Sequence, residues 1–373
     1  MEEISPGLEN VYIKYTELTY IDGNKGIMRY RGYDINDLAE KSSFEAVSYL
    51  MLFGKFPDTK ELTKFRDKIN SNLVLADYLK NILLAMPERS DALGMLQTLL
   101  SAKASEELNY KYTKENDREK IPEILGQVLS MVANIYRIKE GDNIIDPDPY
   151  EAYAETFLRA CFGSANKNQI KAMDSALILY MDHEIPASTT AALVTASTLS
   201  DMYSALASAV TALRGPLHGG AAEGAYRQFL EIGSPENVDK WFNDNIINGK
   251  RRLVGFGHRV YRTYDPRLKT FKKYADMLAT TDEVKNILAT AKKLEDTGVN
   301  AFGARGIYTN TDFYSGIVFK AIGFPVDMFT TLFGLSRVSG ILAHITEYVE
   351  TQERLIRPRA IYRGQGERKL DNN

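Results

Sequence analysis

Three of the four histidines in this chain lie beside glycine or acidic residues that suit a ligand-binding site. They are His183, between two acids, His218, within Gly-Pro-Leu-His-Gly-Gly, and His258, at the end of Gly-Phe-Gly-His. Glycine lets a ligand approach the main chain, and an imidazole can donate a hydrogen bond or a proton near neutral pH. Asp312, within Asn-Thr-Asp-Phe-Tyr-Ser-Gly, completes the set. These residues predict an active site that is assembled from distant segments.

His218 and Asp312 each stand at the expected start of a helix. Small residues follow His218, from Ala221 to Ala225, and predict a tight turn into a closely packed helix. The helix macrodipole would keep this histidine neutral, so that it could donate a hydrogen bond without being charged. Each residue also has a structural alternative: His218 could cap a turn, and aspartate is a common N-cap. The sequence alone does not separate a cap from a general base.

A basic segment surrounds His258. Five arginines and one lysine lie between Lys250 and Arg267, in a chain whose net charge is −3. Gly255-Phe256-Gly257 resembles part of a dinucleotide-binding loop, but the last glycine and the strand-turn-helix context are missing, which argues against nicotinamide binding. A solvated basic face is the alternative. The glycines and the histidine within the run favour an anion site.

The remaining candidates do not favour a metal centre. His183 has acidic neighbours, but no second histidine lies at ligand spacing, and Cys161 is the only cysteine. A thiolate cluster and an intrachain disulfide are therefore excluded, and we expect no metal. His344 lies in an expected helix without nearby glycine, so we interpret it as an ordinary core or surface histidine.

Composition excludes several function classes. The chain has 373 residues, 44% of them hydrophobic and 25% charged, which is typical of soluble globular proteins and long enough for two domains. The lack of a basic excess argues against a nucleic-acid partner. The first residues are acidic and lack an apolar stretch, so we expect a cytoplasmic protein.

The positions of these residues depend on an almost entirely helical chain. One N-terminal β-hairpin is predicted. Apolar residues alternate loosely over residues 11–20, the turn Asp22-Gly23 follows, and residues 27–30 would form the returning strand. In almost all of the chain after residue 30, apolar residues recur with the period of a helix. Strands do not alternate with helices, so Rossmann and barrel folds are disfavoured. We expect helices over 44–53, from 59 onward with Asp58 as N-cap, and over 76–85, 91–106, 121–138, 150–162, 167–180, 187–213, 221–232, 238–248, 268–277, 283–294, 312–322 and 335–349.

The stretch 187–213 is long enough to cross a bilayer and has a single charge, Asp201. It consists of Ala, Ser and Thr rather than Leu, Ile and Phe, and is too polar to insert well. We expect one long buried helix whose small side chains let neighbouring helices approach closely, in the core or at a subunit interface. No membrane contact is predicted.

Three motifs occur in an order and spacing that resemble the citrate synthase family, in the short form of archaea and many bacteria. They are Gly-Pro-Leu-His-Gly-Gly, Gly-Phe-Gly-His-Arg-Val-Tyr and Asn-Thr-Asp-Phe-Tyr-Ser-Gly, and the resemblance extends from Gly7 to Arg359. It implies an all-α fold with a large dimerisation domain (1–214 and 324–373). A smaller mobile domain (215–323) would close over the substrates and bind coenzyme A (CoA). The helix over 187–213 would then pack across the subunit interface.

The resemblance also implies a reaction. Acetyl-CoA would condense with oxaloacetate, and citryl-CoA would be hydrolysed to citrate and CoA, as in the tricarboxylic acid cycle, without a metal or other cofactor. Asp312 would remove a proton from the acetyl methyl group, His218 would stabilise the enol at the thioester oxygen, and His258 would polarise the ketone of oxaloacetate.

The same resemblance implies the binding residues. The carboxylates of oxaloacetate and citrate would contact His183, Arg267, Arg337 and Arg357. Planar guanidinium groups suit this task, because they can bind a carboxylate through two hydrogen bonds. Arg357 would come from the partner subunit, so that the site exists only in a homodimer. CoA would contact Arg252, Leu253, Val254, Gly255, Phe256, Gly257, Arg262 and Asn310.

Two alternatives remain open at this point. A 2-methylcitrate synthase would have the same fold and catalytic residues but prefer propionyl-CoA, and one methylene changes binding by only about 1–3 kcal/mol. A non-catalytic helical dimer would serve as a scaffold, but it would not need His218, His258 and Asp312 together.

Overall fold

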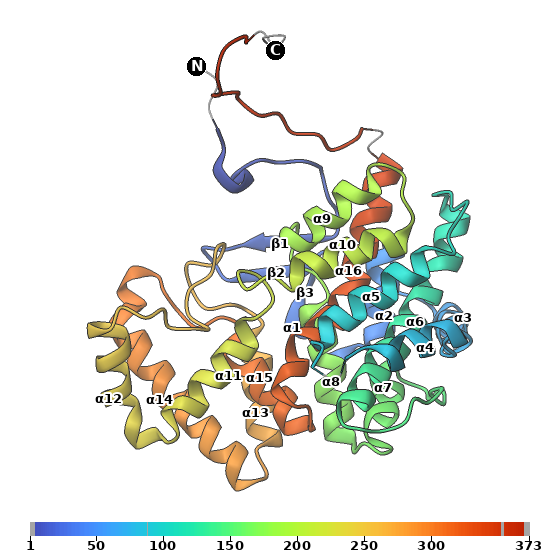
Figure 1. Cartoon of the computed structure of the whole chain (residues 1–373). Helices are drawn as coiled ribbons and strands as arrows, with labels where there is room; N and C mark the ends of the chain where they lie inside the picture. Colours follow the sequence, from blue (N-terminus) through green and yellow to red (C-terminus); the bar gives the residue numbers. More distant parts are fainter. Residues whose placement is uncertain (1–3, 88, 352–353, 369–373) are drawn as a thin grey trace, which may run out of the picture.

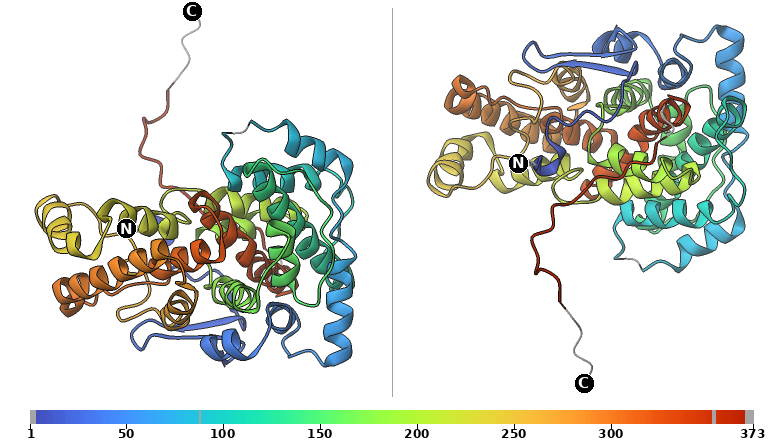
Figure 2. Two further views of the ribbon diagram at one scale, coloured as in Figure 1. Left: turned by 90° about the horizontal axis from the view of Figure 1, so that it is seen from below. Right: turned by 90° about the horizontal axis from the view of Figure 1, so that it is seen from above.

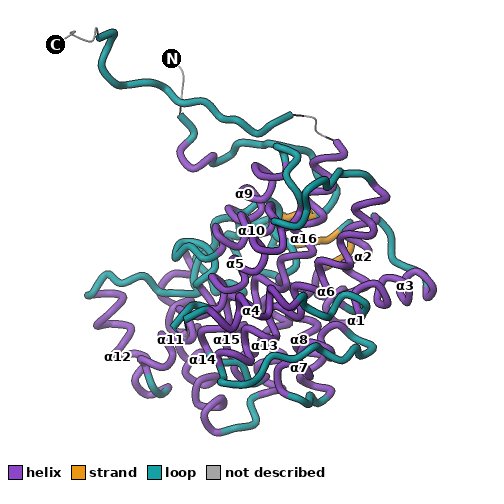
Figure 3. Tube along the Cα trace, turned by 45° about the vertical axis from the view of Figure 1, so that its right-hand side comes forward, coloured by secondary structure: helices purple, strands orange, loops and turns teal. Residues whose placement is uncertain are grey.

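The computed structural model describes residues 4–87, 89–351 and 354–368, and it is almost entirely helical (Figures 1 and 3). Its one sheet, within those ranges, has three antiparallel strands in the order β1-β2-β3. The strands are β1 (Thr19–Asp22), β2 (Ile27–Tyr30) and β3 (Tyr33–Asp34). The predicted hairpin is confirmed. The first strand is shorter than expected: before it, Lys14 and Glu17 bond with the last helix.

The described chain also contains sixteen α-helices. They are α1 (Ile35–Lys41), α2 (Phe44–Phe53), α3 (Thr59–Asn70), α4 (Asp77–Ala85), α5 (Ala92–Ala104), α6 (Lys114–Lys139), α7 (Tyr153–Phe162), α8 (Lys167–Tyr180), α9 (Ala187–Ala196), α10 (Met202–Leu213), α11 (Ala221–Ile232), α12 (Val238–Phe242), α13 (Leu268–Leu278), α14 (Asp282–Phe302), α15 (Asp312–Ile322) and α16 (Phe329–Thr351). The predicted N-cap Asp58 is confirmed, since its side chain accepts a hydrogen bond from the Glu61 amide of α3.

The expected single helix over 187–213 is wrong, because the chain breaks between α9 and α10. Leu199 has a left-handed backbone (φ 65°), and Asp201 caps α10 by accepting from the amide of Ser204 at 2.9 Å. Polar side chains that bond their own backbone favour such a break over a continuous helix. The two helices pack against each other, with Thr195 Oγ1 donating to Ser208 Oγ at 2.9 Å. Their small residues thus pack within a helical hairpin of one chain.

The last helix, α16, runs through the middle of the protein. Within the described residues, only the segment Val326–Thr351 has the length and composition to span a membrane, and 89% of its apolar window is buried inside the protein. It contacts α2, α5, α6, α8, α9 and α10. Core burial therefore explains its apolar character.

Helices α11 to α14 gather on one side of the molecule, and the helices before α11 lie on the other (Figures 1 and 2). Helix α15 joins the two groups, because it contacts α11 and α13 as well as α8. The predicted domain boundaries, at residues 214/215 and 323/324, both fall just after a helix end. The division into a large and a small domain stays a prediction.

Candidate active site

His218 lies in the loop between α10 and α11 and presents one free ring nitrogen. Its Nε2 accepts from the main-chain amide of Ser188 at 3.2 Å, so the proton of the neutral ring lies on Nδ1. Burial, helped by the charge of Arg337, lowers the pKa of His218 to about 4. The neutral form is therefore expected at neutral pH, and burial and the charge of Arg337 both favour it.

His258 has the opposite tautomer to His218, with its ring proton on Nε2. Its Nδ1 accepts from the amides of Val260 (3.0 Å) and Tyr261 (3.2 Å), which leaves the proton on Nε2. Burial is the largest cause that lowers the pKa of His258 to about 4, and Arg267 adds to it. His258 is thus a neutral hydrogen-bond donor.

The glycine loop before His258 is joined to the segment that leads into α15. Phe256 forms a β-bridge with Thr309, and the carbonyl of Gly255 accepts from the amide of Asn310 at 2.9 Å. Gly255 has φ 81°, and a Cβ there would lie 2.7 Å from the ring of Phe313, so a larger residue would not fit. The loop therefore fixes His258 relative to the residues just before Asp312.

Asp312 is the first residue of α15, and its side chain does not cap the helix. The N-cap is Thr311, and the Asp312 Oδ1 instead accepts from the Tyr180 hydroxyl at 2.6 Å. Burial raises the pKa of Asp312, against the opposing effects of Tyr180, Arg267 and Arg337. A raised pKa makes the carboxylate a stronger base, which suits proton abstraction.

Two buried guanidinium groups accompany these residues. Arg267 is held by Asp265 through two hydrogen bonds of 2.9 and 2.7 Å. Arg337 donates from Nε to the carbonyl of Tyr180 at 2.8 Å and lies over the ring of Phe333. Within the described residues Arg337 has no carboxylate in ion-pair contact, and burial lowers its pKa. A buried cation without an internal partner favours an anionic ligand.

His183 lies next to His258, with 5.0 Å between the ring centroids. Its Nε2 is 3.2 Å from the hydroxyl of Tyr261, and burial, Arg267 and His258 hold its pKa well below the usual value. The charges of Arg267 and Arg337 act on both His183 and Asp312. Six of the predicted residues therefore share one electrostatic environment, and they are His183, His218, His258, Arg267, Asp312 and Arg337.

The predicted CoA residues differ in how accessible they are. The side chains of Leu253 and Phe256 are buried in the core, so only their main chain can face a ligand. The side chain of Asn310 donates from Nδ2 to the carbonyl of Gly257 at 2.9 Å and stabilises the loop. Arg252 and Arg262 are exposed, and Arg262 donates to the carbonyl of His258 at 3.1 Å.

One arginine of the basic segment around His258 is held by contacts within the protein. Arg251 pairs with Glu231 at 2.6 Å and lies over the ring of Trp241. Val254 donates its amide to Gln228 at 3.1 Å. The solvated-surface alternative therefore holds for Arg251, and the exposed cations Lys250, Arg252, Arg259 and Arg262 remain as candidates for an anion.

Arg357 is not brought to the other site residues within the single chain. It is exposed, in a tail that extends away from the body after α16 (Figure 1). The tail touches the body through the amide of Ile356, which donates to Ser197 Oγ at 3.1 Å.

Two site residues gave no signal in the sequence. Tyr180 ends α8 and looks like a core aromatic, and Ser188 is one of many small residues in α9. Asp265 could have been found, because it stands two residues before Arg267. In the described ranges, no three His, Cys, Asp or Glu side chains are grouped to hold a metal.

The family model "Citrate synthase, C-terminal domain" matches residues 7–359 of this chain. Citrate synthase of Saccharolobus solfataricus is 55% identical over 366 residues, covering 98% of this chain and 97% of that protein. Citrate synthase of Thermoplasma acidophilum is 52% identical over 99% of this chain and 97% of its own length.

Two solved structures are similar throughout. A ternary complex of the Thermoplasma acidophilum citrate synthase with carboxymethyl coenzyme A and oxaloacetate has a TM-score of 0.96, at 52% identity, and covers 99% of this chain and 98% of that one. The structure of citrate synthase from Pyrobaculum aerophilum has a TM-score of 0.91 at 38% identity, and the match covers 98% of this chain and 94% of that one.

Proposed function

This chain belongs to the citrate synthase family, and we propose that His218, His258 and Asp312 carry out its reaction. The reaction condenses acetyl-CoA with oxaloacetate and hydrolyses citryl-CoA to citrate and CoA. One observation supports the assignment most strongly: two neutral imidazoles, each with a single free proton, lie in the same charged environment as a carboxylate of raised pKa.

Enol formation is the first step. Asp312 takes a proton from the methyl group of acetyl-CoA, and the electron pair moves onto the thioester oxygen. Nδ1–H of His218 donates a hydrogen bond to that oxygen, because Nε2 is already occupied by the Ser188 amide. His218 is neutral, and its Nδ1–H stabilises the developing charge as a preorganised hydrogen-bond donor.

Condensation is the second step. Nε2–H of His258 polarises the ketone of oxaloacetate, the enol carbon attacks, and the former ketone oxygen takes a proton from His258. The proton that Asp312 removed from the methyl group replaces the one that His258 gave up, so the condensation has no net proton change. Arg267, Arg337 and His183 hold the carboxylates. Water then cleaves the thioester of citryl-CoA, which releases citrate and the CoA thiol.

CoA binding has two components in this proposal. Exposed Arg252 and Arg262 attract its phosphates, and main-chain groups between Leu253 and Gly257 receive the rest. A homodimer completes the oxaloacetate site, with Arg357 supplied by the partner subunit and residues 215–323 closing over both substrates. Closure would exclude water until condensation is finished. We place the reaction in the tricarboxylic acid cycle.

The relatives described above are citrate synthases, which supports acetyl-CoA rather than propionyl-CoA as the acyl donor. The test is release of CoA thiol by the purified protein, with and without oxaloacetate, for each acyl-CoA. We expect rapid release from acetyl-CoA only when oxaloacetate is present, and slower release from propionyl-CoA. Faster turnover of propionyl-CoA, or thiol release that does not need oxaloacetate, would contradict the proposal.

A further inference from the structure

Asp182 directly precedes His183 and is fully buried, yet it takes no part in the chemistry above. Its main chain is tied to β2, because its amide donates to the Tyr30 hydroxyl at 3.0 Å and its carbonyl accepts from that hydroxyl at 2.9 Å. The packing is also close on the other side: a Cβ on Gly340 of α16 would lie 2.1 Å from the carbonyl oxygen of Met181. The backbone that leads into His183 is therefore fixed on two sides.

The carboxylate of Asp182 shapes the turn that contains His183. Its Oδ2 accepts from the amide of Glu184 at 3.2 Å, two residues along the chain. Glu184 has a left-handed backbone (φ 57°), which is unfavourable for a residue with a side chain. An aspartate that bonds the second following amide stabilises such a turn. His183 stands in the middle of it, so its orientation depends on where this carboxylate lies.

Two further donors, both side chains, hold that carboxylate. Thr19 Oγ1 of β1 donates to Oδ2, and His344 Nε2 lies 3.2 Å from Oδ2. Burial alone would raise the pKa of Asp182, but His344, Arg337 and Thr19 together keep it below the usual value. Asp182 is therefore an ionised acceptor at neutral pH.

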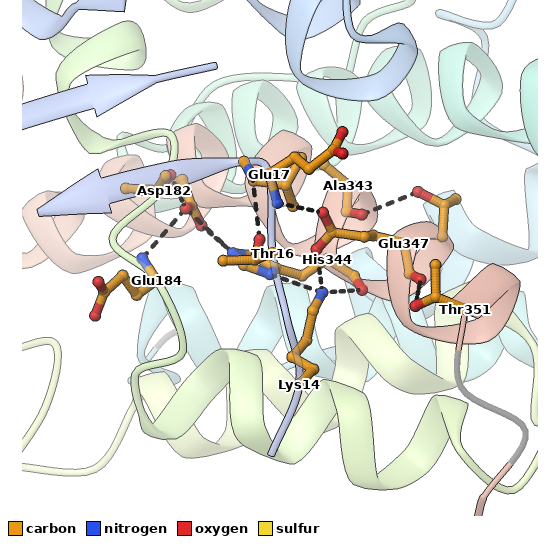
Figure 4. Close-up of polar contacts among 12 residues, drawn as sticks. Lys14, Thr16, Glu17, Asp182, Glu184, Ala343, His344, Glu347 and Thr351 are labelled. Carbon is orange, nitrogen blue, oxygen red and sulfur yellow. Dashed lines mark hydrogen bonds and ion pairs between the residues drawn. The ribbon is translucent and has the colours of Figure 1, made fainter. Parts of the chain in front are cut away.

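The state of the His344 ring follows from its other neighbour. Its Nδ1 lies 3.3 Å from Lys14 Nζ, and an ammonium can only donate, so Nδ1 accepts and the proton lies on Nε2, facing Asp182. Lys14 also donates to the carbonyl of His344 at 3.3 Å and pairs with Glu347 at 2.5 Å. Figure 4 shows the continuous series of contacts from Glu347 through Lys14 and His344 to Asp182.

We propose that Asp182, His344 and Lys14 are positioning residues that orient His183 toward the carboxylate of oxaloacetate. The inference rests on the proposed function, which places His183 in the oxaloacetate site. The residues come from the N-terminal segment, the turn after α8 and α16, and none is itself placed against substrate. Their loss should weaken oxaloacetate binding and leave the use of acetyl-CoA unchanged.

A matched pair of variants tests the role of His344. In His344→Gln the amide nitrogen can take the place of Nε2 and donate to Asp182, whereas in His344→Asn it is too short to do so. We expect the KM for oxaloacetate to rise about tenfold in the Asn variant, which is the change in affinity that follows from losing one hydrogen bond to a charged group. In the Gln variant, the KM should stay within about threefold of the wild-type value. The KM for acetyl-CoA should change less than about twofold in both.

A double-mutant cycle shows whether His344 acts through His183. His183→Ala should raise the KM for oxaloacetate, and His344→Asn should then add little. If His183→Ala has no effect on that KM, the proposed function of His183 is wrong. If His183→Ala raises it and His344→Asn raises it equally in both backgrounds, the proposed function stands and the positioning inference is wrong.

Two peripheral variants cover the case in which His344→Asn does not fold. Thr19→Val removes one donor to Asp182, and Lys14→Met removes the partner of His344 Nδ1. Lys25→Met, on the exposed turn of the same hairpin, is the matched control. We expect both test variants, but not the control, to raise the KM for oxaloacetate. A lower melting temperature with an unchanged KM would show a purely structural role and overturn the inference.

Discussion

At the scale of single residues, the carboxylate of Asp312 accepts a side-chain hydrogen bond that can tune its basicity. The Tyr180 hydroxyl donates to it at 2.6 Å, and the carbonyl of the same residue accepts from Arg337 at 2.8 Å. Tyr180 thus connects the proposed base with one of the two buried cations. A change at Tyr180 should therefore alter proton abstraction without removing any group that touches substrate.

Tyr180→Phe should shift the acidic limb of the rate profile to higher pH. Burial raises the pKa of Asp312 and the Tyr180 hydrogen bond lowers it, so removing that bond raises the pKa further. Asp312 acts as a base only when it is deprotonated. With a higher pKa, a larger fraction of Asp312 is protonated, and therefore inactive, at a given low pH. The measurement is kcat/KM for acetyl-CoA against pH. Tyr226→Phe is the control, because the buried hydroxyl of Tyr226 has no partner in the described chain. An unshifted limb would count against Asp312 as the base.

Asp312→Asn should lower turnover by about 10²–10⁴-fold, the usual effect of removing a general base. Oxaloacetate binding should be retained, since His183, Arg267 and Arg337 are proposed to hold it. Calorimetric titration with oxaloacetate separates the two effects. A parallel loss of oxaloacetate affinity and turnover would indicate that Asp312 mainly supports the structure around the start of α15.

The residues found from sequence were those with a local signal. His218, His258 and Asp312 stand in glycine-containing motifs, which mark close backbone approach even without a structure. Tyr180 and His344 had no such signal, because each lies in a helix and becomes informative only through partners far away in sequence. Long-range contacts of this kind cannot be inferred from residue spacing in one chain.

At the scale of elements, α14 supports the segment that leads into α15. The buried carboxylate of Glu295 accepts from Thr309 Oγ1 and from the Tyr314 hydroxyl, both at 2.7 Å. Lys272 of α13 pairs with it at 2.6 Å. One side chain therefore joins α13, α14 and both flanks of Asp312.

Glu295→Ala should lower the free energy of unfolding by about 3 kcal/mol, because it leaves buried donors without an acceptor. Turnover should fall as well, since Asp312 lies between Thr309 and Tyr314. Urea denaturation measures the first effect and steady-state kinetics the second. Asp296→Ala changes the next, exposed carboxylate and should cost less than about 0.5 kcal/mol. Equal effects of the two substitutions would exclude a role for the Glu295 cluster.

Helix positions were predicted well where both ends had a signal. The predicted bounds of α2, α8, α11 and α15 agree with the structure. Helix α6 begins at Lys114, before the expected start at residue 121, because it continues through Pro122 despite the hydrogen bond that proline removes. The break between α9 and α10 was missed, since Asp201 looked like one polar residue in an apolar run.

At the scale of the whole molecule, the proposed contribution of Arg357 to the partner's site would make the chemistry depend on assembly. Homodimers of Arg357→Ala and of His218→Ala should both be nearly inactive. In a mixed dimer, one site would have both lesions and the other neither, so the mixed dimer should have about half of the wild-type activity. A statistical mixture contains roughly half mixed dimers, and recovery of about a quarter of wild-type activity is expected.

Subunit exchange must be verified first, for example by following differently tagged chains through native mass spectrometry. A mixture of Arg357→Ala with itself is the control and should stay inactive. Exchange without any recovery of activity would place Arg357 in its own subunit's site, or in none.

Helix α16 is buried along most of its length and holds Arg337 and His344 two turns apart on one face. The core of the protein and one wall of the site are therefore the same piece of chain. Substitutions that improve packing there will also move Arg337, which is proposed to hold oxaloacetate, so this helix should tolerate little sequence change during evolution. Engineering for heat resistance has more freedom on α3, where only Phe65 and Ile69 are buried.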